Sequence, residues 1–330
     1  MNRAIRTDRK GRQLITGLGG GAGRVIALLA FTLLLASCTA VKLGYENLPR
    51  LIQWQADRYL SLDSAQENLV NRHARSLQQW HRQNLLPVYA DFLRRVEEEM
   101  RNPVTASQVA EWRRTVVEAW VPIADRLAPA VAELGVTLRP EQIAHLREVI
   151  AKTNDKAARE YRPADPAKRQ EARFKRLVNR AESFLGDPGE AQRQEMRQSA
   201  ASMAQTEDVW WQARLARQAV IVDLLDDLSS NKPEIGEATR RARVALAGLF
   251  SDQGPAANPA AQATPVNQQH QSVPVGLAQL AELRRQAQAA AAAGDELTAR
   301  LLALATSEQR RRAITRLGDY RQDFQLLAAR

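Results

Sequence analysis

Residues 69–96 read LVNRHARSLQQWHRQNLLPVYADFLRRV, and their mainly apolar positions recur every three or four residues. This spacing places one face of an α-helix against a core. The residues that share the face are Leu69, His73, Leu77, Trp80, Asn84, Val88, Phe92 and Val96. The pattern keeps its phase across Pro87, so the stretch predicts one long helix that is kinked at this proline.

Helical spacing continues along the rest of the chain after residue 38. A second long run, residues 109–134, crosses Pro122 and Pro129 and stops at Gly135. Residues 277–293 predict an alanine-rich helix that ends at Gly294. No sustained alternation of β-branched residues occurs. We therefore expect an all-α fold, arranged as an elongated bundle of antiparallel helical hairpins with kinked long helices.

The N-terminus carries the parts of a secretory signal. A basic stretch precedes the apolar run Val25–Leu35, and small residues follow it. This run is shorter than the roughly 20 apolar residues that a membrane-spanning helix needs. Leu35-Ala36-Ser37-Cys38 resembles the lipobox of bacterial lipoproteins. The resemblance implies cleavage after Ser37 and lipidation of Cys38 with a diacylglyceryl and an N-acyl group, palmitate among the chains.

The expected lipid anchor predicts where in the cell the protein is located. Several acyl chains hold a protein firmly on a bilayer, so we expect a lipid-anchored protein of the cell envelope that faces the periplasm. By resemblance to the lipoprotein sorting rule, Thr39 favours the outer membrane over the inner membrane. Cys38 is the single cysteine, which excludes an intramolecular disulfide.

The charge of the chain argues against a nucleic-acid partner. Its formal net charge is +10, but six basic residues and one acidic residue precede Cys38, so half of the excess belongs to the signal segment. The remainder is spread over helix faces among acidic residues and forms no compact basic block. We expect a membrane and an envelope protein as partners, and no nucleic acid.

Composition divides the chain into four parts. Residues 1–37 are expected to be the cleaved signal peptide, and residues 38–250 the helical main domain. Residues 251–275 are rich in Pro, Ala, Gln and Asn with little to bury, which predicts a flexible linker. Residues 276–330 predict C-terminal helices, the last of which is expected to dock on the main domain.

No reaction chemistry is visible in the sequence. The four histidines lack His-Glu-x-x-His spacing, and the chain after residue 38 contains no Gly-x-Ser-x-Gly or phosphate-binding loop. The sequence thus predicts no catalytic residue, no metal ligand and no cofactor other than the covalent lipid. Because catalytic groups can converge from distant positions, an unrecognised envelope enzyme remains an alternative.

Four segments have the pattern of a helix start, in which a capping residue is followed three positions later by Gln or Glu. They begin at Asp63, Thr105, Asp187 and Thr306, and a weaker match begins at Arg139. Ordinary capping boxes explain this pattern. The segments also resemble the Leu-Thr-x-x-Gln motif of Spy- and CpxP-like periplasmic proteins, which implies a periplasmic chaperone or stress-sensing protein as the second alternative.

Several short sequence motifs indicate that the chain is related to a known protein family. They include Leu43-Gly44-Tyr45-Glu46-Asn47, Trp54, Leu60-Ser61-Leu62-Asp63, Trp80-His81-Arg82, Leu86-Pro87-Val88-Tyr89, Phe184-Leu185-Gly186, Trp210-Trp211, Arg214 and Ser307-Glu308-Gln309-Arg310. Together they resemble a proteobacterial lipoprotein family known as domain of unknown function 6279. The resemblance covers most of residues 38–250 and 305–330, and it implies envelope placement and a helical fold but no known activity.

An interaction surface can be suggested from the same landmarks. Histidine titrates near neutral pH, and arginine can hold a carboxylate or a phosphate, so the candidate residues are Tyr45, Trp80, His81, Arg82 and Tyr89. Packing around the proline kink is the alternative explanation for these residues. Trp54 is expected in the core or at a membrane interface. The sequence as a whole favours a non-enzymatic, partner-binding or structural component of the envelope.

Overall fold

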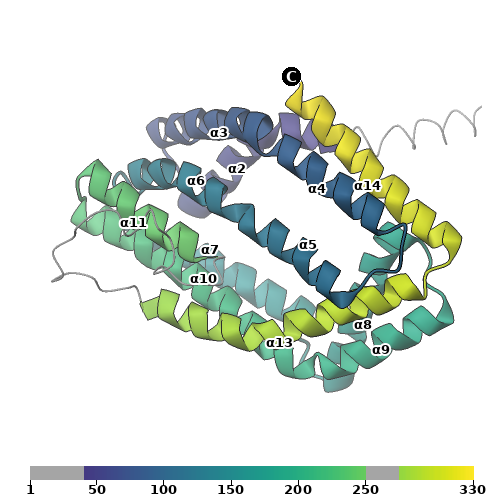
Figure 1. Ribbon diagram of the computed structural model, residues 1–330. Helices are drawn as coiled ribbons and strands as arrows, with labels where there is room; N and C mark the ends of the chain where they lie inside the picture. The colour runs from purple at the N-terminus through teal and green to yellow at the C-terminus, as the bar shows by residue number, and fades with distance from the viewer. Residues whose placement is uncertain (1–40, 250–274) are drawn as a thin grey trace, which may run out of the picture. The chain divides into compact units, whose positions relative to one another are not determined.

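The structure is a computed structural model and describes residues 41–249 and 275–330. These residues contain twelve helices and no strand, which confirms the all-α prediction (Figure 1). The expected signal peptide, Cys38, Thr39 and residues 251–274 of the expected linker lie outside the described residues. None of the helices in the described part of the chain is long and apolar enough to cross a bilayer.

The helices follow one another with short connections. In chain order they are α2 (Leu48–Leu60), α3 (Ser64–Asn84), α4 (Leu86–Glu99), α5 (Ala106–Glu118), α6 (Trp120–Gly135), α7 (Pro140–Tyr161), α8 (Pro166–Leu185), α9 (Glu190–Ser202), α10 (Ala204–Asn231), α11 (Ile235–Gly248), α13 (Val275–Ala303) and α14 (Ser307–Ala328). The chain divides into two compact units, Met1–Tyr45 and Glu46–Arg330. All twelve helices belong to the second unit.

Three single-residue breaks interrupt long helical runs. Leu85 separates α3 from α4 two residues before Pro87, and Ala119 separates α5 from α6 three residues before Pro122. Met203 separates α9 from α10 without any proline. Pro129 lies inside α6 without ending it. Proline removes a backbone donor, which accounts for the first two breaks but not for the third.

The alanine-rich segment near the C-terminus differs from the prediction. We expected a helix that ends at Gly294, but α13 continues through this glycine to Ala303. The neighbouring Asp295 is buried and accepts hydrogen bonds from Arg113 of α5. This ion pair ties α13 to α5 directly beside Gly294, so tertiary contacts override the low helix propensity of glycine.

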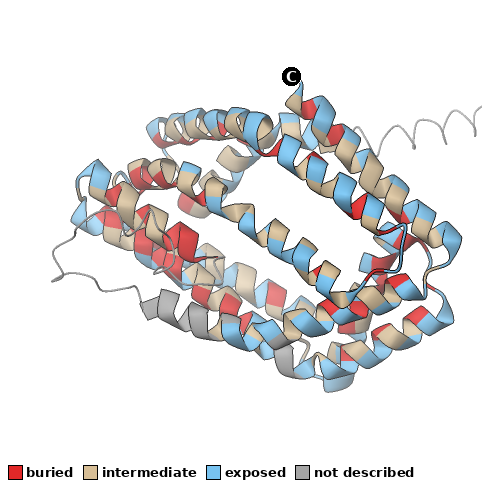
Figure 2. Ribbon diagram, viewed as in Figure 1, coloured by how far each residue is buried: buried red, intermediate tan, exposed pale blue. Residues whose placement is uncertain are grey.

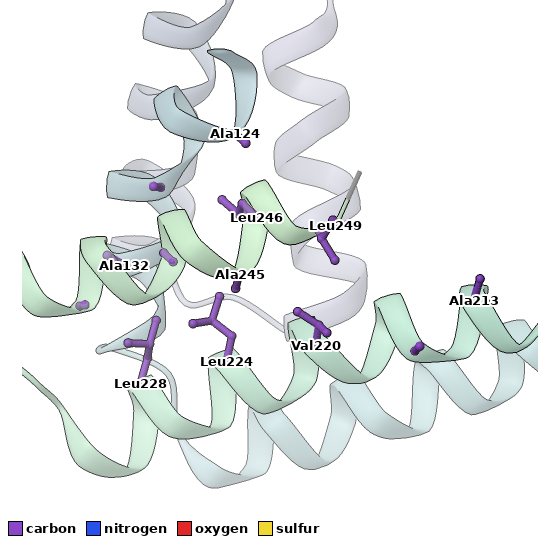
Figure 3. Packing of buried hydrophobic residues seen from close by; sticks show 13 residues of the cluster. Ala124, Ala132, Ala213, Val220, Leu224, Leu228, Ala245, Leu246 and Leu249 are labelled. Atoms are coloured by element: carbon purple, nitrogen blue, oxygen red, sulfur yellow. The ribbon is translucent and has the colours of Figure 1, made fainter. Parts of the chain in front are cut away.

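The densest part of the core joins α6, α10 and α11. Alanines at four-residue spacing on α6 face alanines on α11, and α10 adds Val220, Leu224 and Leu228 (Figure 3). Small side chains allow the two helices to approach closely. Figure 2 shows buried residues concentrated where these helices meet. The six alanines are Ala124, Ala128, Ala132, Ala238, Ala242 and Ala245.

The last two helices pack on the earlier ones. α14 lies along α4, and α13 lies along α10 and α5 (Figure 1). Arg321 of α14 donates to the buried Glu97 of α4 at 2.8 Å, and Arg310 donates to the carbonyl oxygens of Met100 and Asn102. These contacts place residues 275–330 in the same compact unit as the preceding helices.

Helix starts bear out most of the predicted capping boxes. Asp63, Thr105 and Thr306 each accept from the backbone three residues on, and the glutamine there accepts from the capping residue. The box expected at Asp187 is wrong by two residues, because α9 begins at Glu190 and Gln192 accepts from Gly189 N–H. At α7, Arg139 has no accepting side chain, so only the Gln142 half of the box forms.

Candidate binding groove

An open groove lies between α2, α7 and α10, with a volume of about 810 Å³. Its size is that of a site for a small ligand. Most of the lining is apolar, and the polar exceptions are two arginines, two glutamines and one tyrosine. The lining residues are Leu51, Ile52, Trp54, Gln55, Ala56, Tyr59, Leu60, Leu146, Ile150, Arg214, Arg217, Gln218, Ile221, Leu225 and Leu249.

Helix α2, which forms one wall of the groove, has apolar residues on its buried face and also on an exposed face. Ile52, Ala56 and Tyr59 pack against the cluster that α2 shares with α3, α7 and α10. Leu51 and Trp54 lie three residues apart and hence on a common face, with 49% and 60% of their surfaces exposed. Scattered apolar side chains are normal on protein surfaces, but two that are exposed side by side at the edge of an apolar groove make this face a candidate for binding.

A buried amide pair positions the C-terminal end of α2. Gln66 and Gln142 donate to each other's side-chain oxygens at 3.2 and 2.8 Å. Gln142 also donates to the carbonyl oxygens of Leu60 and Ser61 at 2.9 and 3.0 Å. These carbonyls end α2, where Ser61 adopts a left-handed conformation. The start of α7 thereby holds α2 in place beside the groove.

The floor of the groove is formed by α7 and α10. Leu146 and Ile150 of α7 lie one turn apart, as do Ile221 and Leu225 of α10. All four belong to the cluster that packs beneath α2. The floor is therefore a continuous hydrocarbon surface that is anchored to the core.

A cationic group borders this apolar floor. Arg214 and Arg217 lie one turn apart on α10. Arg214 Nε donates to Asn154 Oδ1 at 3.1 Å, and Gln218 exchanges hydrogen bonds with the same asparagine. The Arg214 guanidinium also lies 6.0 Å from the centre of the Trp211 ring. The described residues that hold Arg214 in position are thus neutral.

Arg217 has no acidic partner among the described residues. Partial burial lowers the pKa of its guanidinium, and the positive charge of Arg214 lowers it further. Arginine nevertheless stays protonated in proteins. Two partly buried positive charges therefore stand side by side, an arrangement that an anion would stabilise.

The lining of the groove offers guanidinium groups and hydrocarbon surface. Among the described residues that line it there is no carboxylate, histidine, cysteine or lysine. Guanidinium groups can bind an anion by two parallel hydrogen bonds, and the apolar floor can cover a hydrocarbon group. No cluster of three or more potential metal ligands was found in residues 41–249 and 275–330.

The residues suggested as an interaction surface point to different neighbours. Trp80 lies 6.0 Å from the guanidinium of Arg126 on α6. His81 makes an edge contact with Tyr89 at 5.4 Å between ring centres, and Tyr89 makes another with Phe324 of α14 at 6.1 Å. Burial lowers the pKa of His81 and raises that of Tyr89. Arg82 is half-buried on the same turn of α3.

Tyr45 and Cys38 are the other two residues that the sequence singled out. Tyr45 is half-buried and belongs to the compact unit Met1–Tyr45. Cys38 lies outside the described residues. None of the suggested residues lines the groove. One landmark of the sequence does, since Arg214 stands at its cationic border.

Part of the groove could have been predicted from the sequence. Leu51 and Trp54 fall outside the stripe of Leu48, Ile52, Ala56 and Tyr59 that α2 buries, so they give the helix a second apolar face. Trp54 lines the groove with 60% of its surface exposed, so it lies outside the core. The part of the groove that α10 forms could not be predicted from the sequence, because the apolar residues of α10 are distributed around the helix.

Comparison with known proteins yields one match. The model of a family described as a family of unknown function (DUF6279) matches residues 58–241, more than half of the chain. The match includes the α7 and α10 sides of the groove and omits residues 48–57 of α2. No curated protein and no solved structure matches the chain.

Proposed function

We propose that this chain, which belongs to the family of unknown function DUF6279, is a non-enzymatic, lipid-anchored protein of the cell envelope that binds an apolar ligand in the groove between α2, α7 and α10. One observation carries the binding role: an open, mainly apolar groove whose lip exposes Leu51 and Trp54. Exposed apolar surface of this kind is typical of ligand or partner sites.

The sequence around Cys38 supports the anchor. A basic stretch, a short apolar run and a lipobox-like ending occur in the order that lipidation requires. Nine residues separate Cys38 from the start of α2. An extended chain spans at most about 3.6 Å per residue, so a lipid on Cys38 would keep α2 within about 35 Å of the bilayer. The groove would then have membrane lipids as its nearest source of apolar ligands.

The anchor is tested by blocking its formation. Globomycin, or Cys38→Ser, should leave unprocessed precursor that lacks acyl groups, as mass spectrometry of the isolated protein would show. Fractionation of the treated and untreated envelopes should place the normal protein in the outer rather than the inner membrane. Normal processing of the Cys38→Ser variant would contradict the lipoprotein proposal.

The binding role is tested with an uncharged probe. Residues 39–330, made without the leader, retain the whole compact unit Glu46–Arg330 and its hydrophobic clusters. We expect N-phenyl-1-naphthylamine to bind this protein with increased fluorescence. Leu51→Asn should weaken binding, whereas Leu326→Asn on α14, where the leucine is 44% exposed, should not. Absence of binding, or equal effects of the two substitutions, would refute the groove as a binding site.

The chaperone and protein-partner alternatives predict different results for residues 39–330. Of the glutamines that resemble the Spy and CpxP motif, Gln66 and Gln142 are only 3% exposed, whereas Gln108 and Gln309 are half-buried. Suppression of client aggregation at stoichiometric amounts would nevertheless favour the chaperone alternative. Crosslinking in cells from position 51 to a single protein would instead favour an envelope protein as the occupant of the groove.

A further inference from the structure

The cationic border of the groove carries information about what binds there. Arg214 and Arg217 are the charged residues of the lining, and both are positive. Elsewhere in the described chain, the buried Arg173 pairs with the buried Glu207, and Arg113 pairs with the buried Asp295. No acid of residues 41–249 or 275–330 forms an ion pair with either arginine of the groove. An acidic ligand would supply the counter-charge that the described residues do not.

We infer that the groove binds an anionic amphiphile, whose acidic head group pairs with Arg214 and Arg217 while its hydrocarbon chain lies on the apolar floor. This inference rests on the proposed binding function and specifies its ligand. Carboxylate and phosphate are the two acidic groups that arginine pairs bind with two parallel hydrogen bonds.

The position of the two arginines fits a ligand with one charged end. Both lie on a single turn of α10, followed by Ile221 and Leu225 one and two turns further along. Leu146 and Ile150 of α7 extend the apolar floor. Charge is therefore confined to one part of the lining, as an amphiphile requires, whereas a uniformly apolar or a uniformly anionic ligand would leave part of the groove unmatched.

The fixed geometry of Arg214 supports the same assignment. Asn154 receives a hydrogen bond from Arg214 Nε and is itself held by Gln218. With Nε engaged by a neutral group, the terminal nitrogens of the guanidinium remain to donate to an anion. Burial and the neighbouring Arg214 both destabilise the charge on Arg217, so a bound acid would remove an existing repulsion.

A second copy of the chain is a poorer occupant. Without the expected signal segment, which holds +5 of the formal charge of +10, the chain still carries a net charge of +5, and Arg50 and Arg58 flank the exposed face of α2. Self-association through this face would bring like charges towards Arg214 and Arg217. A membrane, in contrast, supplies amphiphiles with acidic head groups.

The inference is tested by displacement of N-phenyl-1-naphthylamine from residues 39–330. The competitors are dodecanoate, dodecyl phosphate, dodecanol and dodecyltrimethylammonium, each below its critical micelle concentration. Since a hydrogen bond to a charged group adds about 1.5–3 kcal/mol, we expect the anions to bind at least about tenfold more tightly than the alcohol or the cation. This preference should shrink as salt is added.

Charge-removing variants locate the head group. The double substitution Arg214→Gln and Arg217→Gln should abolish the preference for anions and leave dodecanol binding unchanged. Arg311→Gln on α14, an exposed cation away from the groove, is the matched control and should change neither. A stronger effect on dodecanoate indicates a free fatty acid as the natural ligand, and a stronger effect on dodecyl phosphate indicates a phospholipid head group.

Three results would overturn the inference. Equal affinity for all four head groups would refute an anionic ligand while leaving the proposed apolar-binding function intact. Displacement by none of them, together with no binding of the probe, would refute both. A concentration-dependent dimer in sedimentation that Leu51→Asn dissociates would show that a second copy covers the groove.

Discussion

Two faces of α10 have opposite environments. Val220, Leu224 and Leu228 point to the alanines of α6 and α11 and are at most 8% exposed (Figure 3). One residue further along the helix, and therefore rotated by about 100°, Ile221 and Leu225 point to the groove. The first face is closed by small residues that let helices approach. The second is covered by α2 only in part, which leaves apolar surface beside two unmatched arginines.

The difference shows that hydrophobic content does not distinguish a core from a site. Both faces of α10 are apolar, but the closed face meets Ala124, Ala128 and Ala132 at regular spacing. On the open side, α2 presents Leu51 and Trp54 outward. What surrounds the apolar residues decides their role, and that is a property of the tertiary structure.

The largest effect is expected on the closed face. Leu228→Ala removes a fully buried side chain from the cluster of α6, α10 and α11 and should lower the free energy of unfolding by about 2–5 kcal/mol. Leu51→Ala on the open side should change it by no more than about 0.5 kcal/mol. Urea unfolding of both variants measures the contrast, and equal losses would mean that the faces are packed alike.

Substitution of two glycines tests how closely the helices are packed at two positions. A Cβ on Gly135 would lie 2.7 Å from Leu228 Cδ1, whereas a Cβ on Gly294 of α13 would meet nothing within 4 Å. Gly135→Ala should therefore destabilise the protein by about 1–3 kcal/mol. Gly294→Ala should stabilise it by about 0.5–1 kcal/mol, because alanine loses less backbone entropy in a helix. Thermal unfolding would reveal opposite shifts, and shifts of the same sign would disagree with this packing.

The support of α2 is expected to be weaker than the packing of the closed face. Gln142→Leu leaves the carbonyl oxygens of Leu60 and Ser61 without this donor. Because Ser61 is exposed and can bond to water, we expect a loss of about 1–2 kcal/mol in the free energy of unfolding. N-phenyl-1-naphthylamine should also bind less tightly, since α2 forms one wall of the groove. Unchanged probe binding would show that α2 does not depend on this amide.

The smallest effect concerns the surface link between α10 and α11. Hydrogen bonds from Arg240 and Arg241 lower the pKa of Glu237 to about 2, and Arg241 also pairs with Asp227 of α10. A lowered folded-state pKa gives stability that is present above the unfolded pKa of about 4.3 and is lost as pH falls towards 2. Because the pair is partly exposed, this stability should not exceed about 1 kcal/mol.

The comparison of Glu237→Gln with the unaltered protein isolates that contribution. The variant should be less stable at pH 7 and should lose less stability than the unaltered protein between pH 4.5 and pH 2.5. Urea titrations at several pH values measure the difference. Parallel pH profiles for the two proteins would show that the pairing of Glu237 with Arg240 and Arg241 adds no stability.

Local signals in the sequence predicted much of the fold. Asp63, Thr105 and Thr306 begin helices where their capping boxes indicate, since capping depends on residues three positions apart. The break near Pro87 follows from the missing backbone donor. The break at Met203 and the continuation of α13 through Gly294 were not predictable, because distant side chains decide them. Arg173, for example, donates to the carbonyl of Ala200 at the end of α9.

The site was less predictable than the fold for the same reason. The second apolar face of α2 is visible as Leu51 and Trp54, and Arg214 is a landmark of the sequence. That Arg214 lacks an acidic partner depends on α7, which brings Asn154 rather than an acid to it from 60 residues away. Charge balance across helices cannot be read from spacing within one helix.

Amide hydrogen exchange with and without dodecanoate tests the difference between the two faces of α10 most directly. The backbone of α2 and α7 reports on the open face, and that of α6 and α11 on the closed face. Dodecanoate should slow exchange in residues 48–60 and 140–161 and leave residues 120–135 and 235–248 unchanged. Equal slowing in both pairs of helices, or slowing in α6 and α11 alone, would contradict the assignment of the open face as the binding site.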